Sequence, residues 1–206
     1  MIEGRAMGSM GANCYLYACM ETKKAVVIDP GADGKSIYRW ILEKGFKVEY
    51  ILLTHGHVDH IGAVDELKEL LGDVQVGIHT GDAGMLTDGR KNLSSYFGPG
   101  LALNKADLLL SDGQELIVGN QRIKVIATPG HSPGSVCFLC SDGLISGDTL
   151  FAGSIGRTDF PGGSMNQLLD GVKKKLLILP DDTRVFPGHG EETSIGEEKR
   201  DNPFLD

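Results

Sequence analysis

The stretch LLTHGHVDHIG, residues 52–62, places three histidines and one aspartate within six positions at the end of an apolar run. The whole chain contains six histidines, so half of them lie in this one segment. Neutral imidazoles and carboxylates are the ligands that zinc, iron and manganese take up in proteins. The segment therefore indicates a metal site, and the next question is which other parts of the chain reach it.

Further coordinating side chains follow other apolar runs in the same way. His131 comes after IKVIATPG, Asp148 after GLISG and His189 after RVFPG, each beside a glycine. In layered α/β folds, sites form where strand ends and their loops converge on a crevice. We therefore expect side chains from four strand ends to meet at one point. They are His55, His57, Asp59, His60, His131, Asp148 and His189.

Seven ligands exceed the four that one tetrahedral ion needs. Two divalent ions about 3.5–4 Å apart that share a carboxylate are typical of two-metal hydrolases. The expected ions are two zinc ions, with iron or manganese as alternatives. The predicted assignment is His55, His57 and His131 on the first ion, Asp59, His60 and His189 on the second, and Asp148 as the bridge. The sixth histidine, His79, is followed by Asp82, and we expect it to be a turn residue or a hydrogen-bond donor behind the ligands.

Short apolar or β-branched runs bounded by Gly, Pro, Asn and Asp predict strands. They are NCYLYAC, KAVVIDPG, VEYILLTHG, VQVGIHT, QELIVGN, QRIKVIATPG, SVCFLCSDG, GLISGD and TRVFPG. Apolar residues at helical spacing predict helices over residues 34–44, 61–71 and 166–179. Residues 90–104 show no clean period and are expected to form a loop. Strands that alternate with amphipathic helices predict an α/β fold with layered sheets.

Length, composition and charge limit the class of protein. A chain of 206 residues that is 41% hydrophobic predicts a single domain over residues 1–206. The formal net charge of −8 disfavours nucleic acid as a partner, and the run Lys173–Lys175 is expected to be a solvated helix face. The sequence shows no apolar segment of the roughly 18 residues that a membrane span needs, and no signal peptide. We therefore expect a cytoplasmic protein that has neither a nucleic-acid nor a membrane partner.

THGHVDH, with His131, Asp148 and His189 downstream, resembles the metallo-β-lactamase superfamily over essentially the whole chain. This resemblance implies a four-layer αββα sandwich with a dinuclear site at one edge. GDTLFAGSIGRTDFPGG, residues 147–163, and the closing EKRDNPFL resemble the short glyoxalase II-like hydrolases within that superfamily. Members that cleave β-lactams through a Cys ligand have this cysteine where Asp148 stands, and flavodiiron-type members have Glu in place of His57. The chain departs from both groups.

The resemblance to glyoxalase II-like proteins implies hydrolysis of a thioester of the S-lactoylglutathione type by a metal-bound hydroxide. Asp59 is the expected catalytic residue, because it could hold that hydroxide as well as bind the second ion. Arg157 in GRTDF matches the position from which these proteins reach the substrate, and a salt bridge to Asp159 is the alternative. Tyr96 and Phe97 are expected to pack within their loop or the core rather than line the pocket. The chain stops about 17 residues after His189, without the C-terminal helical domain of full-length glyoxalase II, so the use of glutathione stays open.

Two other functions also stay open. Persulfide dioxygenases resemble this chain through the GRTDF motif, but they use a single iron bound by two histidines and one aspartate. A non-catalytic metal-binding module is the second alternative, although a closed structural zinc site needs only four ligands.

The first residues allow two interpretations. MIEGRAMGS contains IEGR, which resembles a protease-cleavage scar from protein expression. The alternative is a native edge strand before GANCYLY, and the resemblance to short glyoxalase II-like chains favours it.

Overall fold

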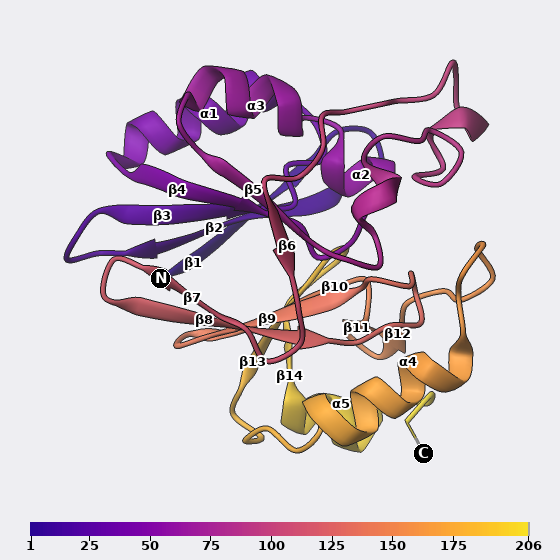
Figure 1. The fold of residues 1–206 in the computed structure, drawn as a ribbon. Coiled ribbons are helices and arrows are strands. Elements are labelled where there is room, and N and C mark those ends of the chain that lie inside the picture. The colour runs from indigo at the N-terminus through magenta and orange to yellow at the C-terminus, as the bar shows by residue number, and fades with distance from the viewer. Residues whose placement is uncertain (206) are drawn as a thin grey trace.

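Two six-stranded sheets packed face to face form the centre of the protein in the computed structural model, which describes residues 1–205 (Figure 1). The first sheet runs in chain order, antiparallel up to β3 and parallel from β3 to β6. Its strands are β1 (Ile2–Met7), β2 (Ala12–Cys19), β3 (Lys24–Ile28), β4 (Lys47–Leu52), β5 (Gln75–His79) and β6 (Leu108–Leu110).

The second sheet has the order β14-β13-β10-β9-β8-β7 and is antiparallel except for the parallel pair β10 and β13. A separate two-stranded hairpin follows β10. The strands of the second sheet are β7 (Glu115–Val118), β8 (Gln121–Ala127), β9 (Val136–Cys140), β10 (Gly143–Gly147), β13 (Arg184–Pro187) and β14 (Thr193–Ser194), and those of the hairpin are β11 (Leu150–Phe151) and β12 (Ser154–Ile155).

Helices cover the outer face of each sheet (Figure 1). The first sheet carries α1 (Gly34–Lys44) and α3 (Val64–Leu71), and the second carries α4 (Met165–Gly171) and α5 (Ile195–Asp201). The short α2 (Val58–Ile61) lies at one end of the sandwich, and a π-helical stretch, Val172–Leu176, continues α4. This is the expected four-layer αββα sandwich. None of the helices in residues 1–205 is long and apolar enough to cross a membrane.

Alternating residues of β2 show how the layers are held together. Cys14 and Leu16 belong to the core between the first sheet and its helices, where Trp40 of α1 is buried. Tyr15 and Tyr17 point to the other face and pack in the core between the two sheets. Because side chains of a strand alternate between faces, a strand buried on both sides is apolar throughout, as this segment is.

The helix predicted over residues 61–71 is divided into α2 and α3 around Gly62 and Ala63. The backbone N–H of Ala63 donates to the Pro30 carbonyl, 2.9 Å away, and a Cβ on Gly62 would stand 2.3 Å from the Gly31 carbonyl oxygen. The loop after β3 therefore packs directly on the chain at this break. Sequence periodicity could not show this contact, because Gly31 is about thirty residues away.

The N-terminal segment forms strand β1, which pairs with β2 in an antiparallel register. Gly4 and Arg5 of the IEGR sequence both lie in this strand. A Cβ on Gly4 would be 2.5 Å from the Tyr15 ring, so glycine leaves room for that ring, and the Arg5 guanidinium lies 4.5 Å from the centre of the Trp40 ring. The expected edge strand is therefore present in the structure. Four further strands were not predicted from the sequence, and each has only two or three residues. They are β6, β11, β12 and β14.

Candidate metal centre

The predicted ligands lie at the ends of four strands that come from both sheets. β4 of the first sheet leads into His55, His57 and α2, while β8, β10 and β13 of the second sheet lead into His131, Asp148 and His189. In Figure 1, α2 and the hairpin β11–β12 lie at the same end of the sandwich, one in each half. The two halves of the fold therefore face each other across this cluster.

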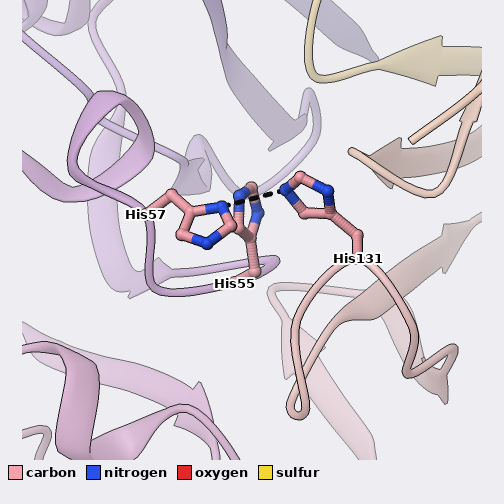
Figure 2. A group of neighbouring side chains, drawn as sticks. All are labelled: His55, His57 and His131. Carbon is pink, nitrogen blue, oxygen red and sulfur yellow. Dashed lines mark hydrogen bonds between the residues drawn. The ribbon is translucent and has the colours of Figure 1, made fainter. Parts of the chain in front are cut away.

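His55, His57 and His131 form one compact group (Figure 2). One ring nitrogen of each lies within 4.8 Å of the others, and all three side chains are buried. Nδ1 of His57 is 2.9 Å from Nε2 of His131. Three imidazoles that converge in this way provide the kind of ligand set that borderline divalent metals take.

Asp59, His60 and His189 form a second group that fits the same distance limit. Nε2 of His189 lies 3.1 Å from Oδ2 of Asp59, and Nε2 of His60 lies 3.7 Å from the same oxygen. These two groups contain the residues of the two predicted ligand sets, but a third group, Asp29, His55 and His60, fits the same distance limit and takes one histidine from each. The division of the ligands between two ions therefore stays a prediction.

The Asp148 carboxylate lies between the two groups. Its Oδ1 is 3.4 Å from Nε2 of His60, and its Oδ2 is 3.5 Å from Nε2 of His131 and 3.8 Å from Nε2 of His189. Gly188, just before His189, makes this approach possible, since a Cβ there would stand 2.1 Å from Asp148 Oδ1. One carboxylate therefore faces nitrogen atoms of both groups, as a bridging ligand would.

Three buried side-chain atoms in this cluster have no hydrogen-bond partner. They are Nε2 of His55, Nε2 of His60 and Oδ1 of Asp148, and among residues 1–205 no other buried side-chain nitrogen or oxygen is left in this way. A buried polar atom without a partner costs about 1–3 kcal/mol, so such atoms call for an explanation. Cations within the cluster would satisfy all three. The donor set, nitrogen-rich with carboxylates, fits zinc, iron or manganese.

For two of the histidines, a hydrogen bond to a group behind the cluster determines which ring nitrogen faces the other ligands. Nδ1 of His131 donates to the Arg157 carbonyl at 2.8 Å, because a carbonyl oxygen can only accept. Nδ1 of His60 donates to Oδ2 of Asp29 at 2.9 Å. In both residues Nε2 is then left with its lone pair toward the other ligands, which is the arrangement that carboxylate and carbonyl partners give to metal-binding histidines.

Asp29 is a buried carboxylate beside the predicted ligands that the sequence analysis missed. Its carboxylate is 1% exposed and accepts hydrogen bonds from the backbone N–H of Thr54 at 2.8 Å and from the Thr54 hydroxyl at 2.6 Å, as well as from His60. It therefore connects the end of β3 to the segment that carries the first histidines. Its position at the end of the apolar run KAVVID follows the same rule that identified Asp148, and that rule would have found it.

Asp82 is a second buried carboxylate near the cluster. Its Oδ2 accepts from the Gly56 N–H at 3.0 Å and from the Ser132 hydroxyl at 2.6 Å, and its Oδ1 accepts from the Gly134 N–H at 2.6 Å. It thus joins the loop between His55 and His57 to the loop after His131. The neighbouring His79 is the last residue of β5, and its side chain accepts from the Gly81 N–H at 3.2 Å in the turn that follows.

Burial and charge divide the histidines into two kinds. Burial lowers the pKa of His55 well below its usual value, and burial together with His131 lowers the pKa of His57 to about 3. Both imidazoles are therefore neutral at pH 7 and able to coordinate. Burial also acts to lower the pKa of His60, but the carboxylates of Asp148 and Asp29 outweigh it and raise this pKa to about 10. Without an ion, His60 therefore holds a proton on both nitrogens, and a cation among these carboxylates would take the place of the proton on Nε2.

The cluster opens onto a cavity of about 470 Å³. Its walls include Met10, Phe97, Phe151, Arg157 and Phe160, with the coordinating side chains His57, Asp59, His131, Asp148 and His189 at one side. A purely structural metal site is closed, whereas a catalytic one keeps an open position for water or substrate. This cluster has room beside it for a small molecule.

Arg157 forms the predicted salt bridge, and its substrate-binding role stays a prediction. Nε and Nη2 each donate to the Asp159 carboxylate at 2.7 Å, which forms the salt bridge, and the same side chain lines the cavity. Its guanidinium also lies 4.0 Å from the centre of the Phe160 ring.

The expectation that Tyr96 and Phe97 pack in the loop or the core was wrong. Their exposed fractions are 73% and 75%, and Phe97 lines the cavity. The loop is held by polar contacts that do not involve these rings, since the Asn92 side chain donates to the carbonyls of Met85 and Leu101 at 2.9 Å.

Comparison with known proteins agrees with this geometry. The family model described as "Metallo-beta-lactamase superfamily" matches residues 7–189. A probable metallo-hydrolase of Bacillus subtilis is 42% identical over 97% of this chain and 94% of its own length. The hydroxyacylglutathione hydrolase GloC of Haemophilus influenzae is 37% identical over 94% of this chain and 92% of its own length. The crystal structure of the B3 metallo-beta-lactamase BLEG-1 superposes with a TM-score of 0.94 at 40% identity, over 100% of this chain and 99% of the other.

Proposed function

Because this chain belongs to the metallo-beta-lactamase superfamily, we propose that it is a metal-dependent hydrolase that cleaves a thioester of the S-lactoylglutathione type. The observation that carries the proposal is the open cluster of imidazoles and carboxylates with three unpartnered buried atoms. The similarity to a hydroxyacylglutathione hydrolase supports the thioester as the substrate class. Both the substrate and the location in the cytoplasm are proposals, as is the absence of nucleic-acid and membrane partners.

Two divalent ions would be held by the two groups of side chains. His55, His57 and His131 would bind the first ion, Asp59, His60 and His189 the second, and Asp148 would bridge them. We propose zinc, with iron or manganese as alternatives that the same donor set accepts. Ions of this kind lower the pKa of water toward about 7 and polarise a carbonyl oxygen.

Asp59 is the proposed catalytic residue. Burial would raise its pKa, but the hydrogen bond from His189 and the charge of His60 reverse this effect, and the net pKa is below its usual value. The carboxylate is therefore ionised at neutral pH and can accept a hydrogen bond from the attacking water, which orients it. Water adds its oxygen to the thioester carbon, the carbon–sulfur bond breaks, and the products are an acid and a thiol. Arg157 at the cavity wall is the proposed substrate-binding residue.

A rival function besides the persulfide dioxygenase is β-lactam hydrolysis. The similarity to the BLEG-1 metallo-beta-lactamase supports β-lactam hydrolysis as a second candidate. In this chain Asp148 stands where the members with a Cys ligand have that cysteine, so it departs from that type of β-lactamase.

The decisive experiment is a metal analysis of the purified protein together with a substrate panel. We expect two divalent ions per chain and hydrolysis of S-lactoylglutathione or a related thioester, with a β-lactam cleaved far more slowly. One iron per chain with rapid oxygen uptake on glutathione persulfide would instead identify a persulfide dioxygenase. A protein that holds metal but turns over no member of the panel would be a non-catalytic metal-binding module.

A further inference from the structure

A second hollow of about 560 Å³ adjoins the cavity at the metal centre. The two hollows share the side chains of Met10, Val58 and Phe97. Val58 is the residue between His57 and Asp59, so the second hollow begins immediately beside the coordinating side chains. It is therefore an extension of the cavity, in a position that a substrate bound at the cluster can reach.

The walls of this second hollow are almost entirely apolar or small. Besides the three shared side chains they comprise Ser9, Ser94, Gly98, Pro99, Gly100 and Leu101. Met10 lies in the turn between β1 and β2, Val58 in α2 and Phe97 in the loop before β6, so three separate segments supply the apolar groups. Met10 is 47% exposed and Phe97 is 75% exposed. Large apolar side chains that converge at a concave surface are typical of ligand-binding sites.

Positively charged side chains are scarce along this path. Of the residues that line the two hollows within residues 1–205, Arg157 is the one lysine or arginine, and two of its N–H groups are already bonded to Asp159. Arg90 of the same loop as Phe97 lies at a different hollow, with Ser95 and Tyr96. Glutathione carries two carboxylates, and the second hollow offers no cation to receive them.

We propose that the second hollow binds an uncharged aliphatic arm of the thioester substrate. This inference rests on the proposed thioester hydrolysis, but it assigns thioesters that carry an apolar chain, in place of glutathione thioesters, as the preferred substrates. The chain passes between Met10 and Phe97 while the thioester group lies at the coordinating side chains. Burial of a methylene group changes affinity about fourfold, so the length of the chain has a measurable effect.

The first test measures kcat/KM of the metal-loaded protein for thioesters of different length. The substrates are the acetyl and hexanoyl thioesters of N-acetylcysteamine, S-hexyl thioacetate and S-lactoylglutathione. If two of the added methylene groups are buried, we expect a gain of at least about tenfold over the acetyl thioester for a six-carbon chain on one side of the thioester. The hexanoyl thioester and S-hexyl thioacetate distinguish a chain on the acyl side from one on the thiol side. Equal values for short and long chains, or a tenfold preference for S-lactoylglutathione, would overturn the proposal.

Two aromatic residues that are neighbours in the chain provide a matched pair of variants. Phe97 lines the second hollow, whereas Tyr96 does not, and both rings are exposed enough that their loss leaves the core intact. Phe97→Ala is expected to abolish most of the gain from the longer chain. Tyr96→Ala is expected to retain it, and an equal effect of the two substitutions would contradict the assignment.

A binding measurement separates this inference from the proposed function. S-hexyl-N-acetylcysteamine is a thioether that cannot be hydrolysed, and its dissociation constant can be measured by calorimetry. We expect it to bind at least about tenfold more tightly than the S-methyl analogue, with the difference lost in Phe97→Ala. If no thioester is turned over but this difference is present, the proposed function fails and the apolar site stands. If thioesters are hydrolysed but the two analogues bind equally, the apolar site is wrong and the hydrolase stands.

Discussion

At the scale of single residues, Asp148 is the group on which both halves of the proposed centre depend. Its two oxygens lie within 3.8 Å of nitrogen atoms from His60, His131 and His189, which belong to both ligand groups. The replacement Asp148→Ala is therefore expected to lower the metal content at both positions, from two ions per chain toward none. Elemental analysis after dialysis measures this. Loss of one ion alone would contradict the bridging position.

Asp82 binds no proposed ion, yet it determines where two ligand loops lie. In Asp82→Asn an NH2 group replaces one of the two acceptor oxygens. This group cannot accept a hydrogen bond, so at least one of the three bonds from Gly56, Ser132 and Gly134 would be lost. We expect metal affinity to fall about 10–100-fold, as it does when groups behind metal ligands are changed. Competition with a chelator of known affinity measures the change.

The matched control for Asp82 is Asp88→Asn. Asp88 lies six residues further along the same connection, and its side chain bonds Arg90 instead of the ligand loops. This variant should keep the metal affinity of the parent protein. Unchanged affinity in a folded Asp82→Asn protein would show that the two loops hold their positions without that carboxylate.

At the scale of elements, Asp107 connects helix α3 to the edge of the first sheet. Its Oδ2 accepts from Lys68 Nζ of α3 at 2.6 Å and from the Val76 N–H of β5 at 2.8 Å. Burial acts to raise the pKa of Asp107, but these two bonds outweigh it, and the pKa is below its usual value of 3.8. The folded protein thus binds this proton more weakly than the unfolded chain. The ionised Asp107 carboxylate therefore stabilises the folded protein above pH 3.8, and this contribution is lost as the pH falls below that value.

Asp107→Asn should therefore lower the free energy of unfolding by about 0.5–1 kcal/mol at pH 7, since the pair is partly exposed to solvent. The difference from the parent should persist to pH 5 and narrow below about pH 4. Urea unfolding of the metal-free proteins at several pH values measures it. The exposed Asp73, just after α3, is the control site, and Asp73→Asn should leave the free energy of unfolding at pH 7 unchanged. Parallel profiles for Asp107→Asn and the parent at every pH would refute the role of this carboxylate.

The bounds of a helix or strand were predicted well where the local sequence pattern determines them. They were predicted poorly where a contact with a distant part of the chain determines them. The helix over residues 34–44 was predicted with its observed bounds, because its apolar stripe and Gly45 after its end are local features. The helix over 61–71 was predicted as one piece, because the contact of Gly62 with Gly31 that divides it is not local. The exposure of Phe97 was also not predicted, and the Asn92 bonds that connect its loop to Met85 and Leu101 are not visible in the sequence pattern.

At the scale of the whole molecule, the proposed ions would connect the two sheets, since His55 follows β4 of the first sheet and Asp148 follows β10 of the second. An ion that binds only the native state adds about 2.7 kcal/mol of stability at a hundredfold excess over its dissociation constant. For a chain of this size each kcal/mol raises Tm by about 2–4 °C. Removal of metal by a chelator should lower Tm by at least roughly 5 °C, as calorimetry or circular dichroism can measure.

Both sheets should unfold in one transition with and without metal, because residues 1–206 are predicted to form a single domain. Addition of zinc after the chelator is removed should restore the original Tm. An unchanged Tm would contradict binding of ions between the halves, and two separate transitions would contradict the single domain.

The sequence by itself determined the layered α/β class, because strand and helix patterns are local properties of the chain. From ligand chemistry at strand ends it also predicted seven coordinating residues. The structure brings these side chains close together, and their division between two ions stays a prediction. Only the tertiary structure decided what lies around the ligands: Asp29 and Asp82 behind them, and the apolar hollow beside them. These features depend on contacts between segments far apart in the chain, such as Asp82 with Ser132, and sequence spacing carries no information about such contacts.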